Sequence, residues 1–223
     1  MKRYAIIVAG GKGIRLGGDI PKQFRLLDGR PVLMHTIEAF FNAGNDIKII
    51  VVLPDAHRNY WTELCNEYGF TVSHTVASGG ETRWHSVKNG LETVDGNSLV
   101  AVHDGVRPLA SVNLINKAFA AAENYGCVVP VTEPTDSLRI TDGNGTSRTV
   151  NRAVYRAVQT PQVFKSDILA DAYKAPYDER FTDDASVVEA ASGRISLIEG
   201  ERSNIKITTP EDLMFAEILM KGG

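Results

Sequence analysis

Four short apolar runs constrain the fold of this chain most. They are Tyr4–Ala9, Ile47–Leu53, Leu99–His103 and Cys127–Val131. Each has the length and the aliphatic content of a strand that is buried on both faces. Helical spacing of apolar residues lies between them, and Thr82 and Ser111 are candidate N-caps of two helices. The sequence therefore predicts an α/β fold with a mainly parallel, twisted sheet and helices on both faces.

The last third of the chain continues this pattern. Ser166–Tyr173 and Asp183–Ala191 have helical character, and Ile195–Glu199 and Ser203–Ile207 have strand character. Thr209 to Asp212 form a capping box, with proline at the first helical position, that predicts a final helix. A length of 223 residues without a linker-like segment fits one domain over residues 1–223.

Residues 132–158 interrupt the alternation. Asp136–Thr141 and Arg148–Val150 are strand-like but polar on both faces, and Asp142-Gly143-Asn144-Gly145 between them is a strong turn signal. An isolated two-stranded hairpin is marginally stable in water. We therefore expect a protruding β-hairpin arm that rests on another surface, with a second subunit as a candidate. A surface hairpin within a monomer is the alternative.

Composition excludes several classes of protein. The net charge of −3 argues against general nucleic-acid binding, which needs a basic stripe. No apolar run approaches the ~20 residues of a membrane-spanning helix, and the residues after Lys2 and Arg3 lack a signal-peptide pattern. A cytoplasmic protein without a membrane partner is expected. The two cysteines, Cys65 and Cys127, are expected to be buried bystanders.

The segment from Ala9 to Gln23 carries the strongest chemical signal. It reads AGGKGIRLGGDIPKQ, and glycines after a strand let backbone N–H groups approach a phosphate chain closely. A Walker loop needs Ser or Thr after Gly-Lys, but Gly13 follows Lys12; a dinucleotide fingerprint needs a third glycine at position 16, but Leu16 stands there. Arg15 and Lys22 remain as two cations around a glycine loop, which suits attack at a phosphorus atom.

Six motifs in order resemble those of a known family. They are GGKGIRLGGDIPKQF, SGGETRWHSVKNGL, VHDGVRP, RAVQTPQVF, FTDDASVVE and NIKITTPEDL. The chain resembles, nearly end to end, the cytidylyltransferases that join CTP to a small polyol phosphate, and most closely those acting on 2-C-methyl-D-erythritol 4-phosphate in the non-mevalonate isoprenoid pathway. The resemblance implies a single-domain Rossmann-like nucleotidyltransferase fold. It also implies a homodimer in which the 132–158 arm reaches into the neighbouring subunit.

The resemblance implies a reaction and roles for particular residues. An oxygen of the acceptor phosphate would attack the α-phosphorus of CTP in line, and pyrophosphate would leave, with Mg²⁺ or another divalent cation as cofactor. The implied catalytic residues are Arg15, Lys22, Arg152 and Lys206. The implied CTP-binding residues are Ala9, Gly10, Gly11, Gly13, Gly80, Glu81, Ser86 and Asp104. The implied acceptor-binding residues are Arg107, Asp136, Ser137, Arg152, Thr160, Thr182 and Lys206. Asp104 is the expected contact to the metal or to the ribose.

Three other functions share part of this pattern. A ribitol-5-phosphate cytidylyltransferase of cell-wall polymer synthesis shares the loop and the IKITTP motif, and the FTDDAS segment favours the methylerythritol enzyme over it. A non-catalytic nucleotide-binding module would not need Arg15, Lys22, Arg152 and Lys206 together. A dinucleotide-dependent oxidoreductase fails on the glycine spacing.

Overall fold

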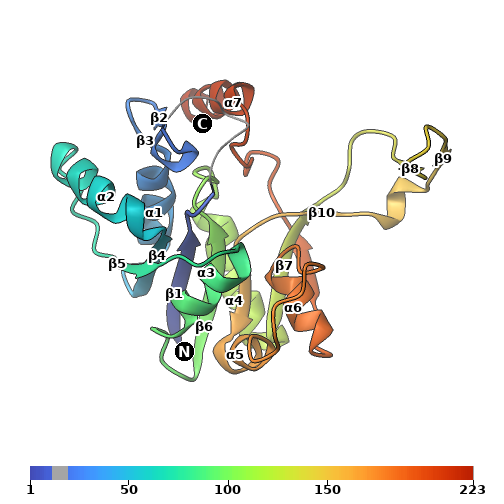
Figure 1. Ribbon diagram of the computed structural model, residues 1–223, viewed down its shortest axis with the longest axis horizontal. Helices are drawn as coiled ribbons and strands as arrows, with labels where there is room; N and C mark the ends of the chain where they lie inside the picture. The colour runs from blue at the N-terminus through green and yellow to red at the C-terminus, as the bar shows by residue number, and fades with distance from the viewer. Residues whose placement is uncertain (12–19, 223) are drawn as a thin grey trace.

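The computed structural model describes residues 1–11 and 20–222, and its centre is an eight-stranded sheet (Figure 1). The strand order is β10-β7-β11-β6-β1-β4-β5, and β12 also pairs with β7. The strands are β1 (Lys2–Val8), β4 (Ile47–Leu53), β5 (Thr75–Ser78), β6 (Ser98–Asp104), β7 (Cys127–Thr132), β10 (Ala157–Val158), β11 (Gln162–Lys165) and β12 (Ser196–Glu199). The α/β class with a mainly parallel sheet is confirmed.

The four apolar runs form β1, β4, β6 and β7. In β1, Ala5 and Ile7 point into one apolar cluster, and Tyr4 and Ile6 point into another on the opposite face. Burial on both faces explains why these runs are continuously apolar rather than alternating with polar residues.

The described chain contains seven α-helices. They are α1 (Val32–Ala43), α2 (Asp55–Glu67), α3 (Arg83–Leu91), α4 (Val112–Tyr125), α5 (Ser166–Ala172), α6 (Asp184–Ala190) and α7 (Pro210–Lys221). Residues of α1, α2 and α4 belong to the first apolar cluster, and residues of α3, α5 and α6 belong to the second. The prediction of helices on both faces is therefore confirmed.

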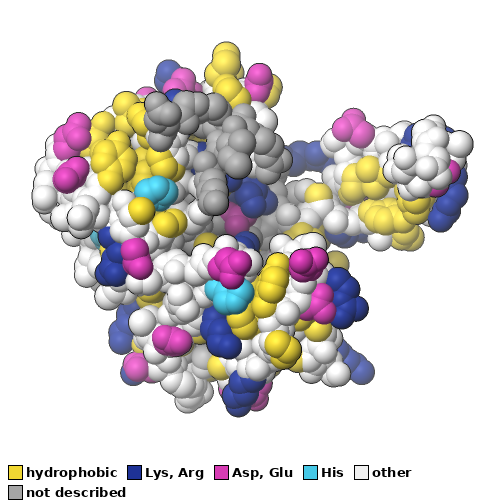
Figure 2. Space-filling view, viewed as in Figure 1, with side chains coloured by type: hydrophobic (Ala, Val, Ile, Leu, Met, Phe, Trp, Pro, Cys, Tyr) yellow, Lys and Arg dark blue, Asp and Glu magenta, His cyan; other side chains and the backbone are white. Residues whose placement is uncertain are grey.

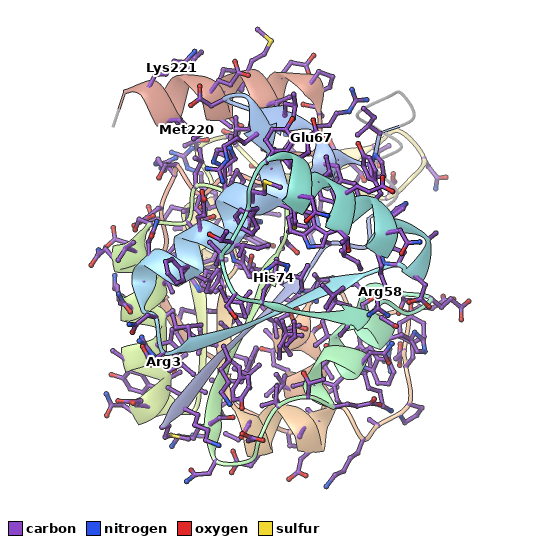
Figure 3. The ribbon with its side chains drawn as sticks, turned by 90° about the vertical axis from the view of Figure 1, so that its left-hand side faces the viewer. Arg3, Arg58, Glu67, His74, Met220 and Lys221 are labelled. Carbon is purple, nitrogen blue, oxygen red and sulfur yellow. The ribbon has the colours of Figure 1, made fainter. Side chains whose placement is uncertain are left out.

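The predicted caps are present. Thr82 accepts a hydrogen bond from the His85 N–H at the start of α3, and Ser111 accepts one from the Leu114 N–H at the start of α4. Thr209 and Asp212 form the capping box of α7, with Pro210 in its first turn. Seen from the α2 side, α7 lies across the top of the molecule, and Arg58 of α2 lies beside β5, where it donates to Ser78 Oγ at 3.2 Å (Figure 3).

The sequence analysis did not predict β11, β10 or the short strands near the start of the chain, and β11 is the most important of these for the site. Gln162–Lys165 forms β11, which runs antiparallel between β6 and β7. Its four residues follow Pro161 and precede α5 directly, so the segment is too short to show a strand period. β11 matters for the site because it places Gln159 and Thr160 beside the end of β6.

One strand prediction was wrong. Ser203–Ile207 contains no strand, because its described hydrogen bonds are to loops, such as Ile207 N–H to Val106 O at 2.9 Å. A small ladder also joins β2 (Leu26–Leu27) to β3 (Arg30–Pro31).

The arm projects from the body of the molecule (Figure 1). Its tip is the antiparallel pair β8 (Arg139–Thr141) and β9 (Ser147–Thr149), as the turn signal predicts, and every residue of both strands is exposed. A 3₁₀ turn, η3 (Arg152–Val154), follows the pair. Another short turn, η2 (Lys22–Phe24), lies near the start of the chain.

Both cysteines are free, Cys127 buried and Cys65 half-buried. Burial raises the pKa of each thiol to about 11, so both thiols stay protonated at neutral pH. Within the described chain, no helix combines the length and apolarity needed to cross a bilayer.

The contact between α3 and the sheet gives a prediction about stability. A Cβ atom on Gly90 would lie 2.8 Å from Ile6 Cγ2 and 3.2 Å from Val52 Cγ2. Gly90→Ala is therefore expected to lower the free energy of unfolding by about 1–3 kcal/mol, although alanine is the better helix former. Denaturant unfolding measures the change. Gly96→Ala is the matched control, since no atom lies within 4 Å of its Cβ position; a stabilised Gly90→Ala would contradict the close packing.

Candidate functional site

A pocket lies at the carboxyl ends of β1 and β6, where parallel sheets commonly bind ligands. About 640 Å³ of space between its walls is continuous with the surrounding solvent. Its described lining is Val8, Ala9, Gly10, Gly11, Lys22, Gln23, Gly80, Glu81, Thr82, Arg83, Ser86, Asp104, Val106 and Lys206. Figure 2 shows basic and acidic side chains meeting in a hollow near the centre of one face.

The carboxylate of Asp104 is the electrostatic centre of the pocket. Lys206 Nζ lies 3.0 Å from its Oδ2, Arg107 Nε donates to Oδ2 at 3.2 Å, and Arg83 Nε lies 3.7 Å from Oδ1. Burial alone would raise the pKa of Asp104, but the charges of Arg83, Lys206 and Arg107 outweigh it and hold that pKa below its ordinary value. Asp104 is therefore ionised at neutral pH, surrounded by three cations.

Arg83 connects this carboxylate to a second buried acid. Its Nη2 donates to Asp184 Oδ2 at 2.6 Å, and the Tyr173 hydroxyl donates to Asp184 Oδ1 at 2.7 Å. Burial opposes the charge of Arg83, but the nearby charges of Asp184 and Asp104 raise its pKa further above the ordinary range. Arg83 thus stays charged and ties the start of α6 to the pocket.

His103 and Thr160 form a buried pair behind Asp104. The Asp104 N–H donates to Thr160 Oγ1 at 3.1 Å, Thr160 Oγ1 lies 3.0 Å from His103 Nδ1, and His103 Nε2 lies 3.0 Å from the carbonyl oxygen of Arg107. Burial lowers the pKa of His103 to about 4, so the ring is neutral at physiological pH. These bonds link the last residues of β6 to the segment that leads into β11.

The segment that carries Lys206 is held by buried polar contacts. The side chain of Asn204 donates to Thr160 O at 2.8 Å, and the Asn204 carbonyl accepts from Arg107 Nη1 at 2.7 Å. The main chain of Ile207 donates to Val106 O at 2.9 Å. Lys206 therefore enters the pocket from a fixed stretch of backbone, although the stretch is not a strand.

The opposite end of the pocket is built from backbone and small side chains. Ser86 Oγ donates to Thr82 O and accepts from the Gly80 N–H, both at 3.0 Å. Gly80 tolerates no Cβ, which would lie 2.3 Å from His85 Cβ and 2.9 Å from the His85 carbonyl carbon. The fixed hydroxyl and the exposed glycine backbone can read the edge of a flat, polar group.

Two residues hold the described part of the glycine loop. Gln23 is fully buried and donates from Nε2 to Ala9 O at 2.7 Å. Lys22 crosses the backbone at Gly11, where a Cβ would lie 3.0 Å from Lys22 Cε. A glycine at position 11 therefore allows the ammonium group of Lys22 to reach the pocket.

Most of the predicted site residues in the body of the chain lie together. Those that line the pocket are Ala9, Gly10, Gly11, Lys22, Gly80, Glu81, Ser86, Asp104 and Lys206. Arg107 and Thr160 contact Asp104 from behind. Arg15 and Gly13 lie outside the described residues.

Four predicted residues lie away from this pocket. Thr182 is exposed at the start of α6, where its N–H donates to Ser186 Oγ. Asp136, Ser137 and Arg152 are exposed on the arm, and Arg152 donates to the carbonyl oxygen of Thr135. Within one described chain, the arm residues therefore do not join the pocket.

Sequence reasoning missed Arg83, Asp184 and Gln23. All three stand inside motifs that the sequence analysis quotes, next to residues that it does name. Motif membership was the available signal, but pairing between positions 83 and 184 is a long-range contact that spacing does not reveal.

The described residues contain no group of three or more His, Cys, Asp or Glu side chains that could hold a metal by themselves. Asp104 fits a different arrangement: it is a single ionised carboxylate that lines the pocket. Mg²⁺ commonly binds through one or two carboxylates together with substrate phosphates and water. The pocket is therefore compatible with a magnesium ion held mainly by a nucleotide.

Comparison with known proteins identifies the family. A profile described as "IspD: 2-C-methyl-D-erythritol 4-phosphate cytidylyltransferase" matches residues 4–222. The enzyme of that name from Phocaeicola vulgatus is 52% identical over 220 residues, which cover 99% of this chain and 100% of the relative. The one from Azobacteroides pseudotrichonymphae is 55% identical over 223 residues, covering 98% of this chain and 99% of the relative.

Solved structures agree. The 2-C-methyl-D-erythritol 4-phosphate cytidylyltransferase of Thermus thermophilus superimposes with a TM-score of 0.79 at 32% identity, over 99% of this chain and 100% of the other. The 4-diphosphocytidyl-2C-methyl-D-erythritol synthase of Anaerococcus prevotii gives a TM-score of 0.81 at 30% identity, over 98% and 97%. The chain therefore belongs to the 2-C-methyl-D-erythritol 4-phosphate cytidylyltransferase family.

Proposed function

We propose that this enzyme transfers CMP from CTP to 2-C-methyl-D-erythritol 4-phosphate, releasing pyrophosphate and forming a CDP-polyol of the non-mevalonate pathway. The observation that carries the proposal is the pocket itself. Lys22, Arg83 and Lys206 line it together with the ionised Asp104. The pocket lies where β1 ends and the glycine-rich segment begins. Family membership over nearly the whole chain supports the same reaction.

The chemistry needs positive charge rather than a general base. A phosphate oxygen of the acceptor is ionised at neutral pH and attacks the α-phosphorus directly. The main obstacle is the approach of two polyanions, so positioning and charge neutralisation supply the catalysis. The neutral, buried His103 agrees with this mechanism, because both of its ring nitrogens contact protein atoms.

The cations have distinct proposed roles. Lys22 neutralises charge that develops on the transferred phosphoryl group, and Arg15, in the same loop, shares this role. Lys206 and, from the arm, Arg152 hold the acceptor phosphate in line. We also assign Arg83 to the cations of the active site, because it lines the pocket and remains charged through its contacts with Asp104 and Asp184.

The cytosine ring is proposed to bind at the Gly80 and Ser86 end of the pocket, near Ala9, Gly10 and Glu81. Ser86 uses its proton and one lone pair within the protein, which leaves one lone pair to accept from the 4-amino group of cytosine. A base with an acceptor at that position would leave buried polar groups unpaired, which disfavours it.

A divalent cation, Mg²⁺ by our proposal, would be held by Asp104 and by the phosphates of CTP, and would neutralise their charge. Lys206 contacts the same carboxylate oxygen as Arg107. The protein therefore balances the charge of Asp104 when no metal is bound.

The arm is proposed to complete the site of a second subunit in a homodimer. Asp136, Ser137 and Arg152 lie on the arm and away from the pocket of their own chain, and the arm exposes Ile140, Val154, Tyr155 and Val158. Apolar side chains in such number on a projecting hairpin favour a covering partner.

The acceptor is tested with a substrate panel. Pyrophosphate release from CTP and Mg²⁺ is expected with 2-C-methyl-D-erythritol 4-phosphate and to be far slower with ribitol 5-phosphate or a hexose 1-phosphate. Chelation of the metal by EDTA is expected to abolish it. Faster turnover with ribitol 5-phosphate would reassign the acceptor, and no turnover with any of the three would refute the transferase.

Lys22 is tested by a variant that keeps its length. Lys22→Met is expected to lower kcat by about 10²–10³-fold and to change the Kd of CTP much less, because the charge acts mainly on the transition state. Steady-state kinetics and calorimetry measure the two quantities. Lys174→Met, at an exposed lysine that pairs with Asp171, is the control and is expected to match the wild type. Loss of CTP affinity with unchanged kcat would make Lys22 a ground-state contact.

Sharing of sites is tested by mixing variants. Lys22→Met and Arg152→Ala are each expected to be inactive alone. A mixed dimer contains one site with both native residues if Arg152 acts on the partner, so mixing is expected to restore up to about half of the activity per mixed dimer. Subunit exchange is verified with tagged chains; no recovery after exchange would place Arg152 outside the partner's site.

A further inference from the structure

We propose that His103 is a positioning residue for the transfer reaction. Its two ring hydrogen bonds join the Thr160 hydroxyl, which accepts from the Asp104 N–H, to the carbonyl oxygen of Arg107, and so align the charges gathered around the Asp104 carboxylate. The proposal rests on the proposed function for its kinetic consequences, whereas its structural part stands on the contacts alone.

The contacts form a closed circuit. From the Asp104 N–H, hydrogen bonds run through Thr160 Oγ1 at 3.1 Å and His103 Nδ1 at 3.0 Å, then from His103 Nε2 to Arg107 O at 3.0 Å. The Arg107 side chain returns to Asp104 Oδ2 at 3.2 Å, and the Arg107 N–H donates to Asp104 O at 3.1 Å. His103 thus spans the turn that presents Asp104.

The two ends of the circuit determine where its protons lie. A backbone N–H only donates, so Thr160 Oγ1 accepts from Asp104 and keeps its own proton to give. A carbonyl oxygen only accepts, so His103 Nε2 carries a proton. In the neutral ring Nδ1 is then the acceptor, and it takes the Thr160 proton. In the series of hydrogen bonds from the Asp104 N–H to the Arg107 carbonyl oxygen, the donor and the acceptor of each bond are therefore determined.

The same pair also holds the segment that delivers Lys206. Thr160 O accepts from Asn204 Nδ2 at 2.8 Å, and Asn204 O accepts from Arg107 Nη1 at 2.7 Å. Asn204 is fully buried and stands two residues before Lys206. His103 is therefore at the junction of the three segments that bring Asp104, Arg107 and Lys206 together.

Packing alone does not explain a histidine at this position. The ring is fully buried and lies edge-on to Phe40, with centroids 5.0 Å apart. An apolar ring would fill the same space without the cost of burying two polar nitrogens. The cost is offset only because both nitrogens are bonded, and both bonds fix atoms of the segments around Asp104.

The circuit also changes the role of Thr160. Its hydroxyl proton is already donated to His103, and its side chain is buried behind Asp104. Thr160 is therefore a positioning residue as well, rather than a hydrogen-bond donor to the acceptor substrate, which is the role implied by the resemblance.

A double-mutant cycle tests the pair. His103→Phe keeps the ring and removes both hydrogen bonds, and Thr160→Val removes the hydroxyl at nearly constant volume. Each is expected to lower kcat/KM by about 10–100-fold, since small misplacements of reacting groups cost rates of this order. The double variant is expected to lose no more than the worse single variant, and Thr160→Ser is expected to stay within a few-fold of the wild type.

A matched control lies at the other end of the same strand. Ser98 is fully buried, and its hydroxyl donates to Asp95 O at 2.7 Å. Ser98→Ala is expected to lower the thermal midpoint while leaving kcat/KM per folded enzyme unchanged. This control separates the two effects, because a general loss of stability lowers the thermal midpoint without lowering kcat/KM per folded enzyme.

A measurement without turnover separates this proposal from the proposed function. Hydrogen exchange of the Asp104 amide, followed by NMR, is expected to be at least about tenfold faster in Thr160→Val and His103→Phe than in the wild type, and unchanged in Ser98→Ala. Independent losses that multiply in the double variant, or unchanged exchange at Asp104, would overturn the positioning role. If the wild type turns over none of the polyol phosphates, the proposed function fails and the exchange result still decides the role of His103.

Discussion

The charge balance around the Asp104 carboxylate is the interaction on which the rest of the site depends. A buried carboxylate is costly unless cations and hydrogen bonds surround it. Here the cations come from three parts of the chain: Arg83 from α3, Arg107 from the turn after β6, and Lys206 from the segment before α7. Removing any one of them would leave the others misplaced or the carboxylate less compensated. The convergence of these segments is therefore a requirement of electrostatics as well as of catalysis.

Net charge gives little information about such a site. The chain carries −3 overall, yet three of the side chains lining its pocket are cations. Acidic residues elsewhere pair on the surface, as Asp95 does with Lys2 and Asp178 with Arg180. Surface pairs of this kind contribute little to stability and keep the protein's average charge low. The local field at the pocket is set by a few charged groups, whose positions composition does not report.

Local patterns in the sequence predicted the local structure well. Continuous apolar runs identified the central strands, side-chain oxygens identified the caps at Thr82, Ser111 and Thr209, and Asp142 to Gly145 identified the hairpin. The segment at Ser203–Ile207 was wrongly predicted as a strand, because it has strand composition but binds loops instead of a neighbouring strand. β11 was missed because four residues carry too little periodicity.

The candidate site was also predicted only in part. Motif resemblance found most of the described residues that line the pocket, since they stand in motifs whose spacing is readable. It did not find Arg83 or the buried partnership of His103 with Thr160, because these depend on contacts between residues 57 to 101 positions apart. Such contacts follow from sheet order, which alternation of strands and helices leaves undetermined.

The order of the strands has a consequence for how the chain folds as it is synthesised. The first 104 residues contain β1, β4, β5 and β6, which pair with one another in parallel. Among the described strands, β7 pairs with β10, β11 and β12, all of which leave the ribosome after it. β7 therefore waits for β11 before it joins the sheet, and the segment that brings β11 also brings Thr160 to the Asp104 amide. Completion of the sheet and assembly of the pocket therefore occur together, late in the synthesis of the chain.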